Sequence, residues 1–323
     1  MSAKVNSKKI KNMLGSYGII FVLVLLIAVF ASLSPRFLSK DNVFNILRQV
    51  SIVGIISVGM TFVMLTGGID LSCGSVVGAS CVGAALLMTK ANMHPVLACV
   101  IMAVFGTLLG FINGFFIAQL KVPPFIATLG MMTSVRGIAY IITGGLPVFG
   151  FNRAFTVLGQ GYWGMVPIPV VVMFLVFLFG IVFLSYTRMG RHIYGVGGNE
   201  EASRLSGVHV KRIKYLVYGI SGFMSSLAGV VLLARVNSGQ PNAGSGYEMD
   251  VITAVVLGGV SMSGGQGRLI MVIVGVMIMG ILTNGMTMLT INEYVQQFVK
   301  GMVLIAAVAL DSFIKGQKAK TTI

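Results

Sequence analysis

Hydrophobic stretches of roughly 20 residues recur along almost the whole chain, separated by short polar or glycine-rich segments. A helix needs about 20 mainly apolar residues to cross a bilayer, and in lipid its backbone groups must pair internally. The pattern predicts an all-α membrane protein, a polytopic bundle of about ten transmembrane helices. The stretches cover residues 17–33, 46–66, 74–88, 95–119, 125–143, 166–186, 213–234, 251–262, 269–289 and 294–314.

Two of these stretches, 74–88 and 251–262, are short, and each borders or overlaps a glycine-rich segment, at 66–72 and 258–265. Short hydrophobic segments interrupted by glycine are typical of broken helices that line a transport pathway. Both segments carry the pattern Gly-Gly-x-x-x-Ser, and an Asn-Gly pair occurs late in two other stretches. These similarities indicate a possible internal repeat, either parallel or inverted.

The composition excludes an ordinary water-soluble protein. Hydrophobic residues make up 56% of the 323 positions, charged residues only 10%, and the mean hydropathy is +0.95. Glycine occupies 42 positions. Because small residues let helix backbones approach closely in a membrane, this content favours a tightly packed helical bundle.

The formal net charge of +15 needs an explanation. Cytoplasmic loops of membrane proteins retain Lys and Arg. With the N-terminus inside, fifteen Lys and Arg residues fall on the cytoplasmic side and six on the outer side. We therefore expect a single transmembrane domain over residues 1–323 in a bacterial inner membrane, with short cytoplasmic tails at 1–16 and 315–323. The basic charge reflects topology, and no nucleic-acid partner is expected.

The cytoplasmic loop at residues 187–212 carries the signals of a short helix. Asn199 can cap the first amides, and Glu200 and Glu201 suit the positive end of the helix dipole. Gly207 suits the left-handed turn that closes a helix. A helix of about two turns is marginal alone, so either a partner groove or the protein's own bundle must hold it.

Several segments resemble permeases of the ribose, xylose, arabinose and galactoside import family. The resemblance covers nearly the whole chain. The segments that carry it are Gly-Gly-Ile-Asp-Leu-Ser at 67–72, Gly-Gly-Asn-Glu-Glu-Ala at 197–202 with Ser-Gly-Val at 206–208, Ser-Gly-Gln-Pro at 238–241 with Gly-Tyr-Glu at 246–248, and Leu-Gly-Gly-Val-Ser at 257–261.

This resemblance implies a dimeric channel, in which a second copy of the permease is the partner. It also implies an external sugar-binding protein that delivers a monosaccharide and a cytoplasmic ATPase subunit that docks on a short coupling helix. By resemblance, the coupling residues are Asn199, Glu200, Glu201, Ala202, Arg204, Leu205, Ser206 and Gly207.

The chain is expected to be a transport subunit rather than an enzyme. The glycine-rich segment 264–268 lacks the Lys and the Ser or Thr that hold phosphate and magnesium in a Walker A loop. ATP and Mg²⁺ are therefore expected on the partner ATPase, and no cofactor or metal is expected in this chain. An alternative is an ion-coupled secondary transporter of a small polar solute, which needs ionisable groups near the midplane.

A carboxylate at membrane depth is costly, so Asp70 is a candidate pathway or gate residue, although with Ser72 it can instead cap the next helix. Asn113 and Asn284 offer amides suited to sugar hydroxyls or to neighbouring helices. The predicted substrate-pathway residues are Asp70, Ser72, Asn113, Asn284 and Ser261.

Four further charged residues lie in or beside the hydrophobic stretches. Glu248 and Asp250 are predicted contacts for the external binding protein, or caps of the helix that follows, and a cap is expected for Asp250. Arg136 and Lys300 can pair across the bundle, bind exposed carbonyls or extend toward the lipid headgroups of the outer leaflet. We expect them to extend toward the headgroups.

Overall fold

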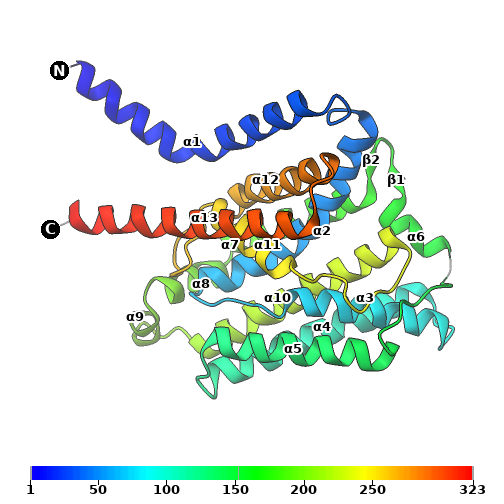
Figure 1. Cartoon of the computed structure of the whole chain (residues 1–323). Helices are drawn as coiled ribbons and strands as arrows, with labels where there is room; N and C mark the ends of the chain where they lie inside the picture. The colour runs from blue at the N-terminus through cyan, green and yellow to red at the C-terminus, as the bar shows by residue number, and fades with distance from the viewer. Residues whose placement is uncertain (1, 152, 322–323) are drawn as a thin grey trace.

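A computed structural model describes residues 2–151 and 153–321 as a bundle of long helices (Figure 1). The elements are α1 (Ser2–Leu33), α2 (Lys40–Leu65), α3 (Cys73–Thr89), α4 (Pro95–Ala118), α5 (Pro124–Thr143), α6 (Arg153–Gln160), β1 (Tyr162–Trp163), β2 (Val166–Pro167), α7 (Ile168–Tyr186), α8 (Arg188–Gly198), α9 (Glu200–Leu205), α10 (Val210–Val236), α11 (Tyr247–Leu257), α12 (Leu269–Met288) and α13 (Glu293–Thr321). The two short strands pair as an antiparallel hairpin.

Each of the ten predicted hydrophobic stretches overlaps one helix, which confirms the all-α membrane class. Among the described residues, however, only seven helices are long and apolar enough to cross a membrane, so the predicted number of about ten spanning helices is not confirmed. The helix at the eighth stretch, α11, has 11 residues. At 1.5 Å per residue it covers about half of a hydrocarbon core of about 30 Å.

The middle of the bundle is formed by α2 and α10, whose side chains are mostly buried, while α5 and α13 are mostly exposed. Glycines bring α4 and α10 into backbone contact. A Cβ atom on Gly106 would lie 2.5 Å from the carbonyl oxygen of Gly222, and one on Gly110 would overlap the carbonyl of Tyr218. Close helix approach through small residues is therefore the packing mode expected from the glycine content.

The chain between α10 and α11 runs as non-helical backbone alongside α3. Gly239 packs against Ala85 near the end of α3, and Gly244 packs against Val77 near its beginning. Gly244 and Gly246 have positive φ angles of 73° and 82°, which permit the sharp turns before α11. The segment from residue 237 to 246 therefore lies beside a hydrophobic helix, where its backbone polar groups need partners.

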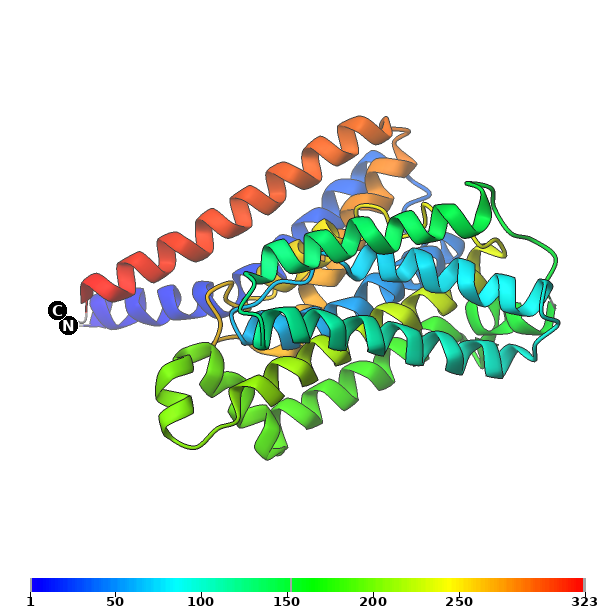
Figure 2. The same cartoon turned by 90° about the horizontal axis from the view of Figure 1, so that it is seen from below.

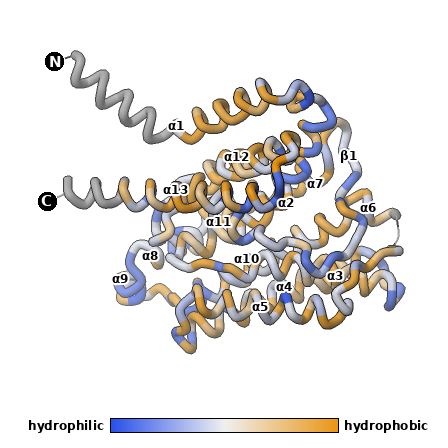
Figure 3. The backbone as a smooth tube through the Cα atoms, in the orientation of Figure 1, coloured by the Kyte–Doolittle hydropathy of each residue, from blue (hydrophilic) through white to orange (hydrophobic). Residues whose placement is uncertain are grey.

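One end of the bundle collects both chain termini and the helices α8 and α9 (Figures 1 and 2). The hydropathy colouring shows α9 as a hydrophilic projection at this end and further hydrophilic loops at the opposite end, with hydrophobic helices between them (Figure 3). The chain ends and the predicted coupling loop therefore lie at the same end of the bundle, and the cytoplasmic placement of that end stays a prediction. The internal repeat stays a prediction.

Two helices were not predicted from the sequence. One is α6, a single amphipathic segment before the hairpin, and the other is α8, which precedes the predicted coupling helix. Four of the eleven residues of α8 are glycine, which argues against a helix by propensity. Tertiary contacts override this, because Ile193 and Val196 are buried and the Thr187 hydroxyl caps the helix by accepting the N–H of Gly190 at 3.0 Å.

Candidate functional site

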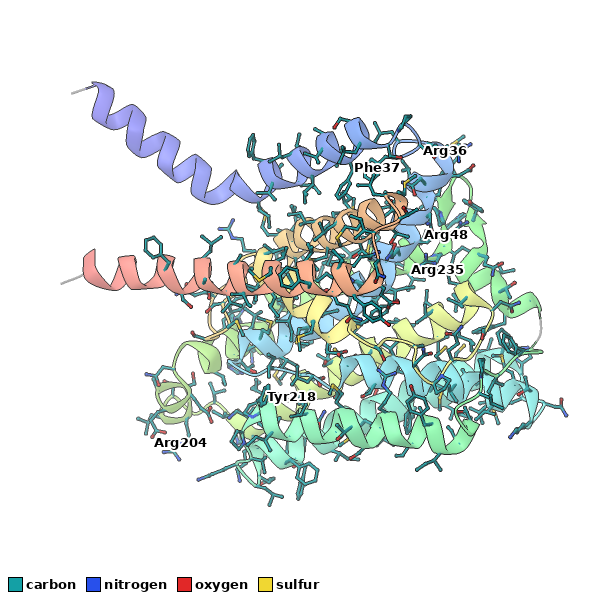
Figure 4. All side chains as sticks on the ribbon, in the orientation of Figure 1. Arg36, Phe37, Arg48, Arg204, Tyr218 and Arg235 are labelled. Atoms are coloured by element: carbon teal, nitrogen blue, oxygen red, sulfur yellow. The ribbon has the colours of Figure 1, made fainter. Side chains whose placement is uncertain are left out.

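Asp70 lies in a polar network in the bundle interior. Its side chain is 1% exposed and accepts hydrogen bonds from the N–H (3.0 Å) and hydroxyl (2.6 Å) of Ser72 and from the Ser221 hydroxyl (2.6 Å) on α10. The Tyr218 hydroxyl, which Figure 4 shows inside the bundle, donates to the carbonyl of Ile69 at 3.2 Å. The network joins the turn before α3 to α10, and the pathway role of Asp70 stays a prediction.

The two candidate amides also join helices. The Asn113 amide on α4 donates to the Ser72 hydroxyl at 3.0 Å and thereby extends the network around Asp70. Asn284 on α12 exchanges two 3.0 Å hydrogen bonds with Asn42 on α2. Ser261 is 3% exposed and accepts the N–H of Ser263 in the turn after α11. Three of the predicted pathway residues, Asp70, Ser72 and Asn113, thus meet in one network, while Asn284 and Ser261 lie elsewhere. All five are buried.

Arg136 does not extend toward outer headgroups, so that expectation is wrong. Its guanidinium on α5 donates to the carbonyls of Pro241 (2.9 Å) and Ala243 (2.7 Å). The contact passes over α3 at Gly78, where a Cβ atom would lie 2.8 Å from the guanidinium. Arg136 therefore supplies the hydrogen bonds that the non-helical segment needs beside α3.

Lys300 likewise does not reach the headgroups. Its ammonium on α13 binds the Asp250 carboxylate on α11 at 2.8 Å. The expectation that Asp250 caps α11 is also wrong, because Gly246 is the N-cap residue and its N–H is accepted by Glu248 at 3.2 Å. Asp250 is 8% exposed and paired, and this burial does not fit a contact with an external protein. Glu248 packs beside Gly74 of α3.

The predicted coupling helix forms with the expected caps, as α9. The Asn199 side chain accepts the N–H of Ala202 at 2.8 Å, and Gly207 has a φ angle of 84°. Glu200 binds Lys214 of α10 at 2.8 Å, which ties the short helix to the bundle. Leu205 is 79% exposed at the end of the helix.

The observed helix is shorter than the predicted range of 199–207, and α8 supports it. Gly195 of α8 lies against Ser203 of α9, which is 8% exposed. Burial raises the pKa of Tyr194 on α8, and its protonated hydroxyl donates to the carbonyl of Gly267 at 3.0 Å. The predicted coupling helix α9 is thus held by α8.

A contact between backbones, which we call the glycine junction, joins α8 to the bundle. Its members are Leu65 at the end of α2, Gly197 in α8, and Gly264 and Gly265 in the loop before α12. The N–H of Gly265 donates to the carbonyl of Leu65 at 2.9 Å. A Cβ atom on Gly197 would overlap that same carbonyl and lie 2.5 Å from the Gly265 nitrogen. No side chain separates the three segments here.

At the opposite end of the bundle, Arg48 and Arg235 lie close together (Figure 4). Arg48 stacks over the Tyr162 ring, 4.8 Å from its centroid, and donates to the carbonyl of Gln160 at 3.2 Å. Arg235 donates to the Asn45 side chain at 3.1 Å. The salt bridges found within residues 2–151 and 153–321 involve neither arginine. The sequence did not predict that Arg48 and Arg235 lie together. It only placed both of them among the six basic residues of the outer side.

The helices α5 and α13 lie on the side of the bundle facing the viewer in Figure 1 and at the top of Figure 2, and α7 lies on the opposite side. The α5–α13 face exposes polar groups. Thr133 and Ser134 of α5 are exposed, as are Ser245 and Gly246 of the non-helical segment. Irregular backbone does not face lipid within the hydrocarbon and is tolerated where it is covered by protein or lines a water-filled path.

A bundle of spanning helices with a half-helix and an unwound segment is typical of membrane transport proteins. Comparison with known families agrees. The family model described as "Branched-chain amino acid transport system / permease component" matches residues 42–308. The chain therefore belongs to this family of permease components.

Curated relatives match over most of their length. The chain is 43% identical over 302 residues to the ribose import permease protein of Bacillus subtilis, covering 92% of each chain. It is 44% identical to the ribose import permease protein of Haemophilus influenzae, covering 92% of this chain and 93% of the relative. It is 38% identical to the L-arabinose transport system permease protein of Escherichia coli, covering 95% and 93%. No solved structure matches the chain.

Proposed function

We propose that this chain is the membrane permease subunit of an ATP-driven importer that carries a monosaccharide, of the ribose type, into the cytoplasm. The substrate class is supported by the ribose and arabinose permeases to which the chain is similar over more than nine tenths of its length. The observation that carries the mechanism is the capped α8–α9 element, which projects where the termini lie. The ion-coupled alternative has no support among these relatives.

The ATPase subunit engages α9 and the adjoining part of α8. Leu205 offers an exposed apolar side chain, flanked by the charged groups of Glu201 and Arg204. Burying a leucine side chain in a partner groove contributes about 1.5–3 kcal/mol. Because Gly197 contacts Leu65 and Gly265 through backbone atoms, a displacement of α8 reaches both α2 and the start of α12. The glycine junction is therefore the route from the ATPase to the spanning helices.

The sugar passes along the α5–α13 face, which a second copy of the chain closes. The carboxylate of Asp70 and the side-chain amide of Asn284 are already paired inside the single chain. The exposed segment at Ser245 and Gly246 needs cover or water at its depth beside α3. Two copies that face each other across α5 and α13 would cover the exposed segment with protein and would enclose a water-filled path between them.

The external sugar-binding protein docks at the end that carries Arg48 and Arg235. Arginine pairs carboxylates in a bidentate geometry, so acidic groups on that protein are the expected partners. The arginine pair is proposed in addition to Glu248, which is partly buried as both arginines are and stays a predicted contact.

Reconstitution tests the proposal. The chain is purified with the ATPase encoded beside it, placed in liposomes, and assayed for uptake of labelled ribose with the companion binding protein. Uptake that requires ATP and persists without proton or sodium gradients supports the proposal. Uptake that follows an ion gradient and needs no ATPase would exclude it.

A further inference from the structure

A long apolar groove opens toward the lipid between α4, α7 and α10. Its volume is about 660 Å³, and it is lined by twelve residues from these three helices. The helix α10 packs closely on α4, while α7 packs on α2 and stands apart from both. Phe111 of α4, Phe179 of α7 and Phe223 of α10 are each between 38% and 49% exposed along its edges. The one polar residue in the lining is Thr107, whose hydroxyl donates to its own helix at 2.7 Å.

The groove runs along the helix axes toward the cytoplasmic end of the bundle. On α10 the lining positions Leu216, Ile220, Phe223 and Leu227 follow the spacing of a single helix face. One turn earlier on that face is Arg212, in the first turn of α10, and its side chain is exposed. Positive charge therefore lies one helical turn beyond the last lining residue of α10, Leu216.

A second arginine lies at the same end. Tyr186, at the end of α7, is 79% exposed, seven residues after Phe179 and so on the same helix face. Arg188, the first residue of α8, follows two residues later and is also exposed. The three salt bridges of the described chain include neither Arg188 nor Arg212. By contrast, the neighbouring Lys211 donates to Gln119 at 2.7 Å.

We propose that this groove binds one anionic phospholipid of the cytoplasmic leaflet. One acyl chain lies in the groove, and Arg212 and Arg188 bind the phosphate group. Basic pockets between spanning helices on the cytoplasmic side are suited to anionic lipid headgroups. A guanidinium group binds phosphate through two parallel N–H···O hydrogen bonds. A second protein helix does not suit the site, because the exposed arginines at its mouth would then lose water without a carboxylate partner.

The binding has a consequence for transport. The groove is bounded by α7 and α10, which are the two helices that lead into and out of the coupling loop. A bound lipid holds these helices at a fixed separation on the side of the bundle away from α5 and α13. This inference stands apart from the proposed function, because lipid binding is measured without sugar or ATPase.

Native mass spectrometry of the purified full chain, titrated with phosphatidylglycerol and with phosphatidylcholine, tests the proposal. We expect tighter retention of phosphatidylglycerol by the wild type. Arg212→Gln should weaken retention about fivefold, the effect of one basic contact near an anionic headgroup. Ile220→Trp, which fills the groove, should abolish the retained lipid. The matched control is Arg204→Gln, since Arg204 lies on the projecting helix α9 (Figure 4), is paired with Glu201 and does not line the groove.

Equal retention of both lipids by the wild type would overturn the headgroup assignment. Unchanged phosphatidylglycerol retention in both Arg212→Gln and Ile220→Trp would overturn the site. If Ile220→Trp does not fold, as judged by thermal unfolding, Thr107→Phe fills the groove from α4 instead. A loss of dimer in the groove-filling variants, with no change in lipid, would assign the groove to a second copy and also overturn the proposal.

Discussion

The N–H of Gly265 donates a 2.9 Å hydrogen bond to the carbonyl of Leu65, and this bond closes the space into which Gly197 fits. Three segments that are far apart in the sequence therefore meet through backbone atoms at the end of the bundle that carries α9. A rigid contact of this kind transmits a displacement, because no flexible side chain is present to absorb it.

The first prediction concerns this junction. Gly197→Ala places a methyl group onto the Leu65 carbonyl, so α8 must shift. We expect sugar uptake by the reconstituted importer to fall at least tenfold while the ATPase still copurifies and hydrolyses ATP. The matched control is Gly198→Ala, because a Cβ atom at Gly198 meets nothing within 4 Å. Equal uptake by the two variants would remove the junction from the coupling route.

The second prediction concerns the exposed leucine of α9. Leu205→Ala should weaken ATPase association about tenfold, since the lost apolar contact is worth about 1.5 kcal/mol. The melting temperature of the isolated chain should not change, because Leu205 is 79% exposed. Binding of the purified ATPase to the detergent-solubilised chain measures the effect. Leu205→Met preserves the apolar volume and should bind normally, and an Ala variant that also bound normally would place the contact elsewhere.

The third prediction concerns the ion pair between α11 and α13. Lys300→Met leaves the Asp250 carboxylate, which is 8% exposed, without its cation. Breaking a buried pair from one side costs about 3 kcal/mol, so the melting temperature in detergent should drop clearly. The double variant Lys300→Met with Asp250→Asn should recover most of the loss. Lys90→Met, at an exposed position after α3, is the control and should melt as the wild type does.

The fourth prediction concerns Arg136 and the non-helical segment. Arg136→Gln removes the guanidinium from the carbonyls of Pro241 and Ala243, and leaving buried polar groups unpaired costs about 1–3 kcal/mol. Gly78→Ala should act in the same direction, because its methyl group would lie 2.8 Å from the guanidinium. Proteolysis of the segment at residues 237–246 should increase in both variants.

The control for this pair is Gly137→Ala. Gly137 neighbours Arg136 on α5, but a Cβ atom there meets nothing within 4 Å. We expect wild-type protease resistance from this variant. If Gly78→Ala and Gly137→Ala resist the protease equally well, the close approach of Arg136 over α3 is not required to hold the segment at residues 237–246.

The sequence by itself determined the membrane class, the approximate positions of the ten hydrophobic helices and the caps of α9. These depend on local properties: runs of apolar residues, the side-chain oxygen of Asn199 and the left-handed conformation of Gly207. Such properties act over a few residues, so they can be read along the chain. The same local reasoning failed at α8, where four glycines oppose a helix that burial of Ile193 and Val196 stabilises.

Only the tertiary structure decided what the charged and amide side chains bind. Asp250 and Lys300 are 50 residues apart, and Asn42 and Asn284 are 242 residues apart. Their pairing follows from which helices lie side by side, and Arg136 reaches two carbonyls because Gly78 leaves room above α3. Within a bilayer every polar group must find a partner, but the hydrophobic pattern that places helices in the membrane does not specify which helices become neighbours.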